Sequence, residues 1–190
     1  MMHTGRLILT PRDPFHAPPE VQTLLKRLRD LEFCAEPLTG LEGQHYRLGD
    51  RFMQLVTFMG CSPHIELEPT SDGKPFCHMI LEGPHPSPRF LQGRNTGSPR
   101  CGNCRRPIPQ WRDEMEAWGK DPKNHLASCP HCGHRENPAS YNWRQSAGSG
   151  RLFVMVENIF PSEAIPSEEL LRALQGRDEE APWRYFYIQD

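Results

Sequence analysis

The sequence has no long apolar run and none of the short motifs that mark the common enzyme classes. Near its start the longest apolar run is Leu7–Leu9, whereas a secretory signal needs about 7–15 apolar residues and a membrane span about 20. We therefore expect a soluble, intracellular and cytoplasmic protein with no membrane partner. A nucleophile elbow, a phosphate-binding glycine loop, a dinucleotide fingerprint and an HExxH motif are all missing. These absences favour a non-catalytic role and leave the question of an enzyme open.

A strong charge of one sign is also missing. The 22 Lys and Arg residues nearly balance the 24 Asp and Glu residues, so the whole chain has no general attraction for nucleic acid or anionic membranes. With 36% apolar and 24% charged residues, the composition lies on the polar side of globular proteins and outside the disordered class. A chain of 190 residues is long enough for one sizeable core and a small appendage.

The apolar pattern before residue 83 predicts a strand, a helix and then a meander. Residues 6–10 form a short apolar run typical of a buried strand. Residues 18–33 place apolar side chains at steps of three and four, as a helix does. From residue 44 the period is two. Residues 44–82 therefore predict an antiparallel meander of about four strands, with turns at Gly49-Asp50 and around Gly73.

After residue 83 the composition changes twice. Residues 83–100 and 137–150 are rich in proline, glycine and serine, as linkers are, and Gly148-Ser149-Gly150 indicates flexibility. The segment that follows is strongly apolar. Residues 166–176 then combine a serine cap, spaced leucines and a terminal glycine, which predicts a helix. Residues 183–190 read as an aromatic strand.

This order of elements predicts an α+β fold with a mainly antiparallel sheet and two helices. We expect one discontinuous α+β domain made of residues 1–90 and 150–190, because neither piece alone has enough strands to cover its helix. A zinc-ribbon module with flanking linkers, residues 95–150, would be inserted between them.

Four of the seven cysteines form two Cys-x-x-Cys pairs, Cys101 with Cys104 and Cys129 with Cys132. A tight turn inside each pair can direct both sulfurs toward one point, and two facing pairs place four thiolates in the tetrahedron that zinc prefers. Gly133 supplies a permissive backbone after the second pair. In a reducing compartment such pairs are more often metal ligands than disulfides. We therefore expect one Zn²⁺ per chain in a closed, structural site.

The second pair, Cys129-Pro130-His131-Cys132-Gly133, resembles a rubredoxin-type knuckle, and residues 101–136 are similar to the zinc-ribbon class. The resemblance covers about a fifth of the chain. It implies a four-cysteine metal site and a small ribbon fold, but no activity. The 24 residues between the two pairs exceed the common ribbon spacing of about 15–20. We expect residues 111–120 to house the extra length as a short helix or a long loop.

Other uses of this segment stay open. Iron in a rubredoxin-like redox centre is one alternative, since four thiolates suit both metals, but no flavin or electron-transfer motif is visible. A thioredoxin-like dithiol needs a βαβ context, whereas both pairs lie among loops. His125, His131 and His134 lie near the pairs. Because four cysteines are available, we expect these histidines to be exposed to solvent and not to bind the metal.

The insert is also the basic part of the chain. Residues 95–150 hold eight Lys and Arg against five Asp and Glu, a net charge of +3, and the remainder has a net charge of −5. Arginines near aromatic rings are typical of single-strand nucleic-acid binding. The alternatives are a protein partner and a purely structural role in which the rings cover a small core. The possible contact residues are Arg105, Arg106, Trp111, Arg112, Arg135, Trp143 and Arg144.

A second metal site is the main alternative to a non-catalytic role. Cys61 and His64 have metal-ligand spacing, and His78 lies on the strand predicted beside them, with Glu66 or Glu68 nearby. Together they would form an open site with a carboxylate base, as in a metal-dependent, hydrolase-like enzyme. The ordinary interpretation is a buried cysteine and a solvated strand face. The sequence thus predicts a zinc-binding protein that acts as a binding or regulatory module, with the enzyme as the alternative.

Overall fold

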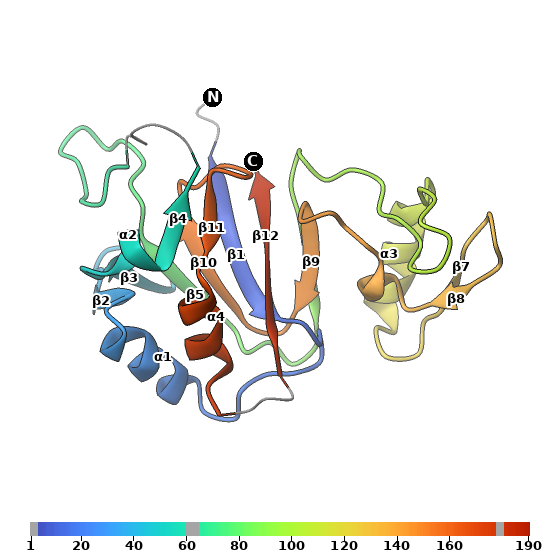
Figure 1. Cartoon of the computed structure of the whole chain (residues 1–190), viewed down its shortest axis with the longest axis horizontal. Helices are drawn as coiled ribbons and strands as arrows, with labels where there is room; N and C mark the ends of the chain where they lie inside the picture. Colours follow the sequence, from blue (N-terminus) through green and yellow to red (C-terminus); the bar gives the residue numbers. More distant parts are fainter. Residues whose placement is uncertain (1–3, 60–64, 178–180) are drawn as a thin grey trace.

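A six-stranded sheet in the order β12-β1-β10-β5-β3-β2 lies at the centre of the fold (Figure 1). The structure is a computed structural model, and it describes residues 4–59, 65–177 and 181–190. All neighbouring strands of this sheet run antiparallel, which confirms the expected α+β class with a mainly antiparallel sheet. The strands are β1 (Gly5–Pro11), β2 (Cys34–Pro37), β3 (Gln44–Leu48), β5 (Met79–Glu82), β10 (Phe153–Glu157) and β12 (Trp183–Gln189).

Strands from both sides of the insert build this sheet. β1 lies between β12 and β10, so the first strand of the chain pairs with two strands that follow residue 150. Leu9, for example, is opposite Tyr185 on one side and Val154 on the other. The two ends of the chain also meet, since the Asp190 amide donates to the Thr4 carbonyl at 2.9 Å. The N-terminal and C-terminal pieces therefore share one sheet.

Two helices, α1 (Val21–Asp30) and α4 (Glu168–Gln175), cover one face of the sheet (Figure 1). Leu24 and Leu28 of α1, Leu170 of α4 and Leu7 of β1 are fully buried in the cluster between them. Burial of each such side chain contributes about 1.5–3 kcal/mol. α4 begins where the sequence predicts, because the Ser167 hydroxyl accepts from the Leu170 amide at 3.2 Å. No helix in the described ranges is long and apolar enough to span a bilayer.

The opposite face of the sheet carries a second apolar cluster that includes Ile8, Phe153 and Phe186. A two-stranded sheet of β6 (Arg89–Gln92) and β9 (Ala147–Gly150) adjoins it, and Leu91 of β6 packs on the cluster. The expectation of flexible linkers here is wrong, because all four residues of β9 are buried. A small residue is needed at Gly148, where a Cβ atom would lie 2.5 Å from Phe186 Cε1.

The predicted meander across residues 44–82 is only partly present. β3 pairs with β2 and β5, and not with the segment after Gly49. That segment forms α2 (Phe52–Leu55) and then β4 (Val56–Phe58), which pairs with β11 (Ala164–Pro166). The reason is burial: Phe52 and Leu55 are three positions apart, so one helical turn places both in the core at 0% exposure. Residues 65–69 form no strand, although Ile65 packs against the core.

The insert between β6 and β9 lies beside the large sheet (Figure 1), and it has a core of its own. Trp111, Trp118 and Trp143 are at most 4% exposed and pack in one cluster with Tyr141. Phe90 of β6 joins them, with its ring centroid 4.8 Å from that of Trp143. The segment between the two cysteine pairs contains a helix, which was one of the two predicted alternatives. The elements of the insert are α3 (Trp111–Lys120), β7 (Ala127–Ser128), β8 (Arg135–Glu136) and the 3-10 helix η1 (Pro138–Ser140).

Gly148→Ala is expected to lower the free energy of unfolding by about 1–3 kcal/mol, because the added methyl group overlaps the buried Phe186 ring. Gly119→Ala is the matched control. Nothing lies within 4 Å of a Cβ atom at this helical position, and alanine favours a helix over glycine by about 1 kcal/mol. Urea denaturation of both variants measures the changes. Equal stability of Gly148→Ala and the wild type would show that β9 is not held against Phe186.

Candidate metal centre

The sulfur atoms of Cys101, Cys104, Cys129 and Cys132 converge on one point. All four lie within 4.8 Å of one another. The sulfurs of Cys101 and Cys132 are 3.8 Å apart, and those of Cys104 and Cys129 are 3.7 Å apart. A tetrahedral Zn²⁺ with bonds of about 2.3 Å separates its sulfur ligands by about 3.8 Å. The spacing therefore suits a tetrahedral metal ion and is too wide for disulfides.

The first Cys-x-x-Cys turn is held by short backbone hydrogen bonds. The Arg105 amide donates to the Cys101 carbonyl at 3.0 Å, and the Cys101 amide donates to the Arg106 carbonyl at 3.0 Å. The Asn103 amide also points at the Cys101 sulfur, at 3.4 Å. These bonds fold the backbone around the sulfur, so that amide groups surround the position where negative charge would lie.

The second turn repeats the first, bond for bond. The Gly133 amide donates to the Cys129 carbonyl at 3.0 Å, and the Cys129 amide donates to the His134 carbonyl at 2.8 Å. The His131 amide lies 3.4 Å from the Cys129 sulfur. The two pairs are thus equivalent knuckles that face each other, which is the arrangement that the two Cys-x-x-Cys motifs predict.

One position in each knuckle has a left-handed backbone. Its φ is 60° at Arg105 and 71° at Gly133. Glycine adopts this conformation without steric cost, whereas a residue with a Cβ atom is strained there by about 1–2 kcal/mol. The first knuckle therefore carries strain that the second avoids.

Backbone amides also favour a thiolate in this cluster. The His134 amide donates to the sulfur of Cys132 and is the main reason why the pKa of Cys132 is lowered to about 6. The side-chain amide of Asn103 contacts the same sulfur at 3.7 Å. Cys132 is exposed, whereas Cys101 and Cys129 are buried. Because the thiolate is the form that binds metals, one ligand is prepared at the open side of the cluster.

Two of the three histidines near the knuckles have other partners, and the third, His134, is exposed. His131 Nε2 lies 3.1 Å from the Pro107 carbonyl oxygen, and His125 Nε2 lies 3.0 Å from a carboxylate oxygen of Glu114. Among the described residues, the four cysteines are the one group of three or more side chains that could hold a metal ion. A cluster of four sulfurs leaves no place for a histidine.

The two tryptophans predicted as contact residues are buried. Trp111 and Trp143 are 1% and 4% exposed, and their rings pack edge to face with centroids 5.2 Å apart. Neither ring is accessible for stacking on a base. The guanidinium of Arg112 covers Trp111 at 4.3 Å from the ring centroid. The predicted arginines, in contrast, are all on the surface: Arg105, Arg106, Arg112, Arg135 and Arg144.

The alternative site near His78 is described only in part. Cys61 and His64 belong to residues 60–64, which lie outside the described ranges. Glu68 forms an ion pair with Arg47. The described residues at this end of the sheet include a pair of histidines, His45 and His78.

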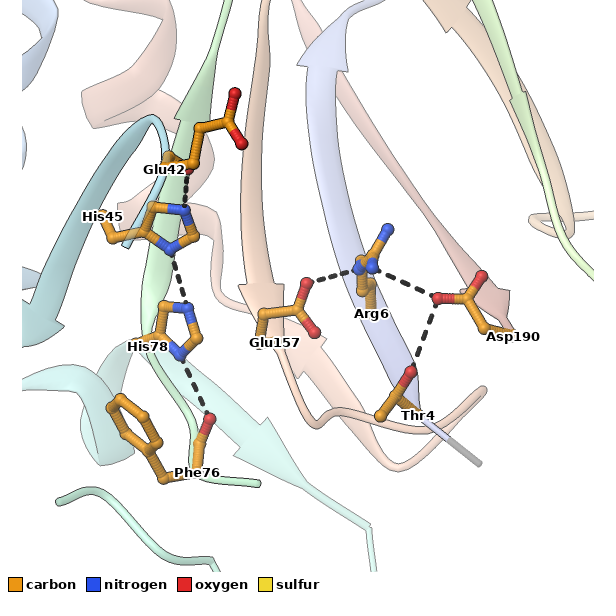
Figure 2. Close-up of polar contacts among 8 residues, drawn as sticks. All are labelled: Thr4, Arg6, Glu42, His45, Phe76, His78, Glu157 and Asp190. Carbon is orange, nitrogen blue, oxygen red and sulfur yellow. Dashed lines mark hydrogen bonds and ion pairs between the residues drawn. The ribbon is translucent and has the colours of Figure 1, made fainter. Parts of the chain in front are cut away.

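His45 and His78 form a chain of hydrogen bonds between two carbonyl groups (Figure 2). His45 Nε2 lies 2.8 Å from the Glu42 carbonyl oxygen, His45 Nδ1 lies 2.9 Å from His78 Nε2, and His78 Nδ1 lies 3.2 Å from the Phe76 carbonyl oxygen. Carbonyl oxygens only accept, so the three contacts need three protons, whereas two neutral rings supply two. Burial outweighs the Phe76 contact and lowers the pKa of His78, so burial favours the neutral ring of His78 although a third proton would complete the chain.

Across the same face, charged groups neutralise one another. Arg6 forms ion pairs with Glu157 and, at 3.2 Å, with Asp190 (Figure 2). Burial raises the pKa of Glu157 although Arg6 opposes the shift. With both ring nitrogens of His78 engaged and the carboxylates of Glu157 and Asp190 paired with Arg6, this end of the sheet has the character of a structural network.

Sequence reasoning missed the residues that support these groups. Nothing in the sequence marked Glu136, whose carboxylate accepts from the Gly102 amide at 2.8 Å across 34 positions of the chain. His45 also carried no signal, because its pairing with His78 depends on the register of β3 and β5. Asn103 did carry a sequence signal, because a residue between two cysteine ligands is placed close to the other knuckle, and its side-chain amide contacts the Cys132 sulfur.

The chain matches no protein-family model, and it shows no significant similarity to a curated protein or to a solved structure. What is established of the site is therefore its geometry, namely four cysteines compatible with a metal ion such as zinc.

Gly133→Ala is expected to lower the free energy of unfolding of the metal-loaded protein by about 1–2 kcal/mol, because alanine is strained at a φ of 71°. Arg105→Ala is the control at the equivalent position of the other knuckle. It keeps a Cβ atom where one already exists and should change stability by less than about 0.5 kcal/mol. Guanidinium denaturation measures both. Similar losses in the two variants would contradict the backbone strain that we assign to alanine at position 133.

The lowered pKa of His78 predicts that acid destabilises the protein through this residue. Since the pKa in the folded protein is below the unfolded value of about 6.5, the unfolded chain binds the proton more readily. The contribution of His78 is complete above pH about 6.5 and falls as the pH drops below it. The difference in unfolding free energy between pH 7.5 and 5.5 should therefore be smaller in His78→Gln. An unchanged difference would contradict the buried, neutral assignment.

Proposed function

We propose that Cys101, Cys104, Cys129 and Cys132 hold one Zn²⁺ per chain in a closed structural site. The observation that carries this proposal is the separation of 3.7–3.8 Å between sulfurs of opposite knuckles, which matches the ligand spacing of tetrahedral zinc. Four protein ligands leave no coordination position for a substrate, so the ion supports the fold and does not catalyse.

Iron at the same four sulfurs is the alternative, since four thiolates suit both metals. Zinc does not change its oxidation state, so the structural role that we propose for the site favours zinc.

We further propose that residues 95–150 act as a non-catalytic binding module on the sheet domain of residues 1–90 and 150–190. Eleven buried residues between Cys101 and Ala147 form the module's own cluster. A metal ion bound by all four cysteines would fix the exposed residues of the knuckles, such as Asn103 and Cys132.

Charge favours a protein partner over nucleic acid for the knuckle surface. Zn²⁺ with four thiolates has a net charge of about −2, which offsets most of the +3 of residues 95–150. Arg105, Arg106 and Arg135 are exposed beside the knuckles and would balance the metal centre. Since Trp111 and Trp143 are buried, the exposed rings that single-strand binding uses are missing here.

Elemental mass spectrometry of protein purified without chelator tests the metal assignment. We expect one zinc per chain in the wild type and loss of most of it in Cys129→Ser, because three thiolates hold zinc far less tightly than four. Cys34→Ser is the matched control, since Cys34 is equally buried but lies in β2, outside the cluster. It should retain one zinc per chain.

The same experiment separates the alternatives. One iron per chain would contradict the zinc assignment and would indicate a redox centre. A second metal that survives Cys129→Ser would revive the enzyme hypothesis. Absence of any metal in the wild type, or full retention in Cys129→Ser, would refute the proposal.

A further inference from the structure

A groove lies where the returning segment of the insert meets β12 at the edge of the sheet. Its cavity volume is about 730 Å³, within the range of about 300–1,000 Å³ that is usual for small-molecule sites. Residues of the insert on one wall include Tyr141, Trp143 and Arg144. The other wall includes Arg12, which follows β1, and Arg184 of β12.

The charge of this groove is one-sided. Three of its lining residues are arginines, and none of its described lining residues is Asp or Glu. In the sheet, Arg184 is opposite Thr10, and the Arg12 amide donates to the Pro182 carbonyl at 2.7 Å, so the two arginines lie on neighbouring segments at the same end of the β1–β12 pair. Arg144, on the opposite wall, is exposed. The described residues give none of the three an ion pair with a carboxylate.

Arg184 in particular lacks a counterion. Its Nη2 donates to the Ser149 carbonyl at 2.9 Å, but its Nε is buried with no hydrogen-bond partner among the described residues. Burial, and next the charge of Arg12, lower the pKa of Arg184. A half-buried guanidinium beside a second one is unfavourable until an anion joins them.

The groove thus brings three arginines together, whereas its described lining holds no carboxylate. A ligand rich in acceptor oxygens complements such a wall.

We propose that this groove binds a small phosphate-bearing ligand whose oxygens bridge Arg12 and Arg184. Guanidinium groups bind phosphate oxygens in a bidentate manner and do so better than ammonium groups. Two of them, Arg184 on β12 and Arg12 directly after β1, match the two or more negative charges of a phosphate ester or a pyrophosphate.

A small ligand fits better than a nucleic-acid strand. A strand needs a basic surface that continues beyond one groove, whereas the chain outside residues 95–150 has a net charge of −5. The three arginines are concentrated within one cavity, which suits a ligand of a few charges.

Isothermal titration calorimetry of the full chain with pyrophosphate and, separately, with ADP tests the proposal at about 150 mM salt, where weak surface attraction is screened. We expect one saturable site per chain. Arg12→Gln and Arg184→Gln should each weaken binding at least about tenfold, as loss of a charged hydrogen-bond donor does. Arg172→Gln, the same loss of charge at an exposed position of α4, should leave the affinity unchanged. Circular dichroism checks that each variant is folded.

The two probes distinguish the source of the phosphate. Tighter binding of ADP identifies a nucleotide, and equal binding identifies the phosphate group alone. Arg12 is exposed, so its variant remains informative if Arg184→Gln does not fold. The proposal is overturned by absence of binding to both probes, by an equal loss in Arg172→Gln, or by binding of a single-stranded oligonucleotide without binding of either small probe.

Discussion

The meeting of four cysteine sulfurs at one point is the constraint on which the insert depends. The sulfurs come from two turns that are 28 positions apart in the sequence, and the strands that flank the second turn, β7 and β8, are two residues long each. So short a hairpin cannot hold two exposed turns in register by itself. A metal ion bound by all four thiolates would do so, because its binding free energy becomes folding free energy.

From this point, packing extends to the rest of the molecule. Cys101 and Cys129 are members of the same buried cluster as Trp111 and Trp143. Phe90 of β6 packs on that cluster, and its neighbour Leu91 packs on the opposite apolar cluster of the large sheet. The metal centre is therefore connected through β6 to the sheet. The arginine-lined groove lies along this junction, so the position of the insert sets the distance between the groove's two walls.

The elements that local pattern encodes were predicted, and those that depend on distant contacts were not. The helix after Ser167, the terminal aromatic strand and the four-cysteine cluster follow from caps, periodicity and spacing within a few residues. The prediction of a hairpin at Gly49 was wrong because burial of Phe52 and Leu55 makes a helical turn more favourable than a strand. β9 was mistaken for a linker, since its glycines are explained only by residues distant in the sequence, Phe186 beside Gly148 and Thr10 beside Gly150. The burial of the tryptophans likewise depends on packing that spacing does not reveal.

The most direct measurement of the central claim is X-ray absorption spectroscopy at the zinc edge of the purified protein. The account predicts a single shell of four sulfur atoms at about 2.3 Å. A shell that includes nitrogen or oxygen at about 2.0–2.1 Å would mean that a histidine or water has taken the place of a cysteine, and it would contradict a closed structural site.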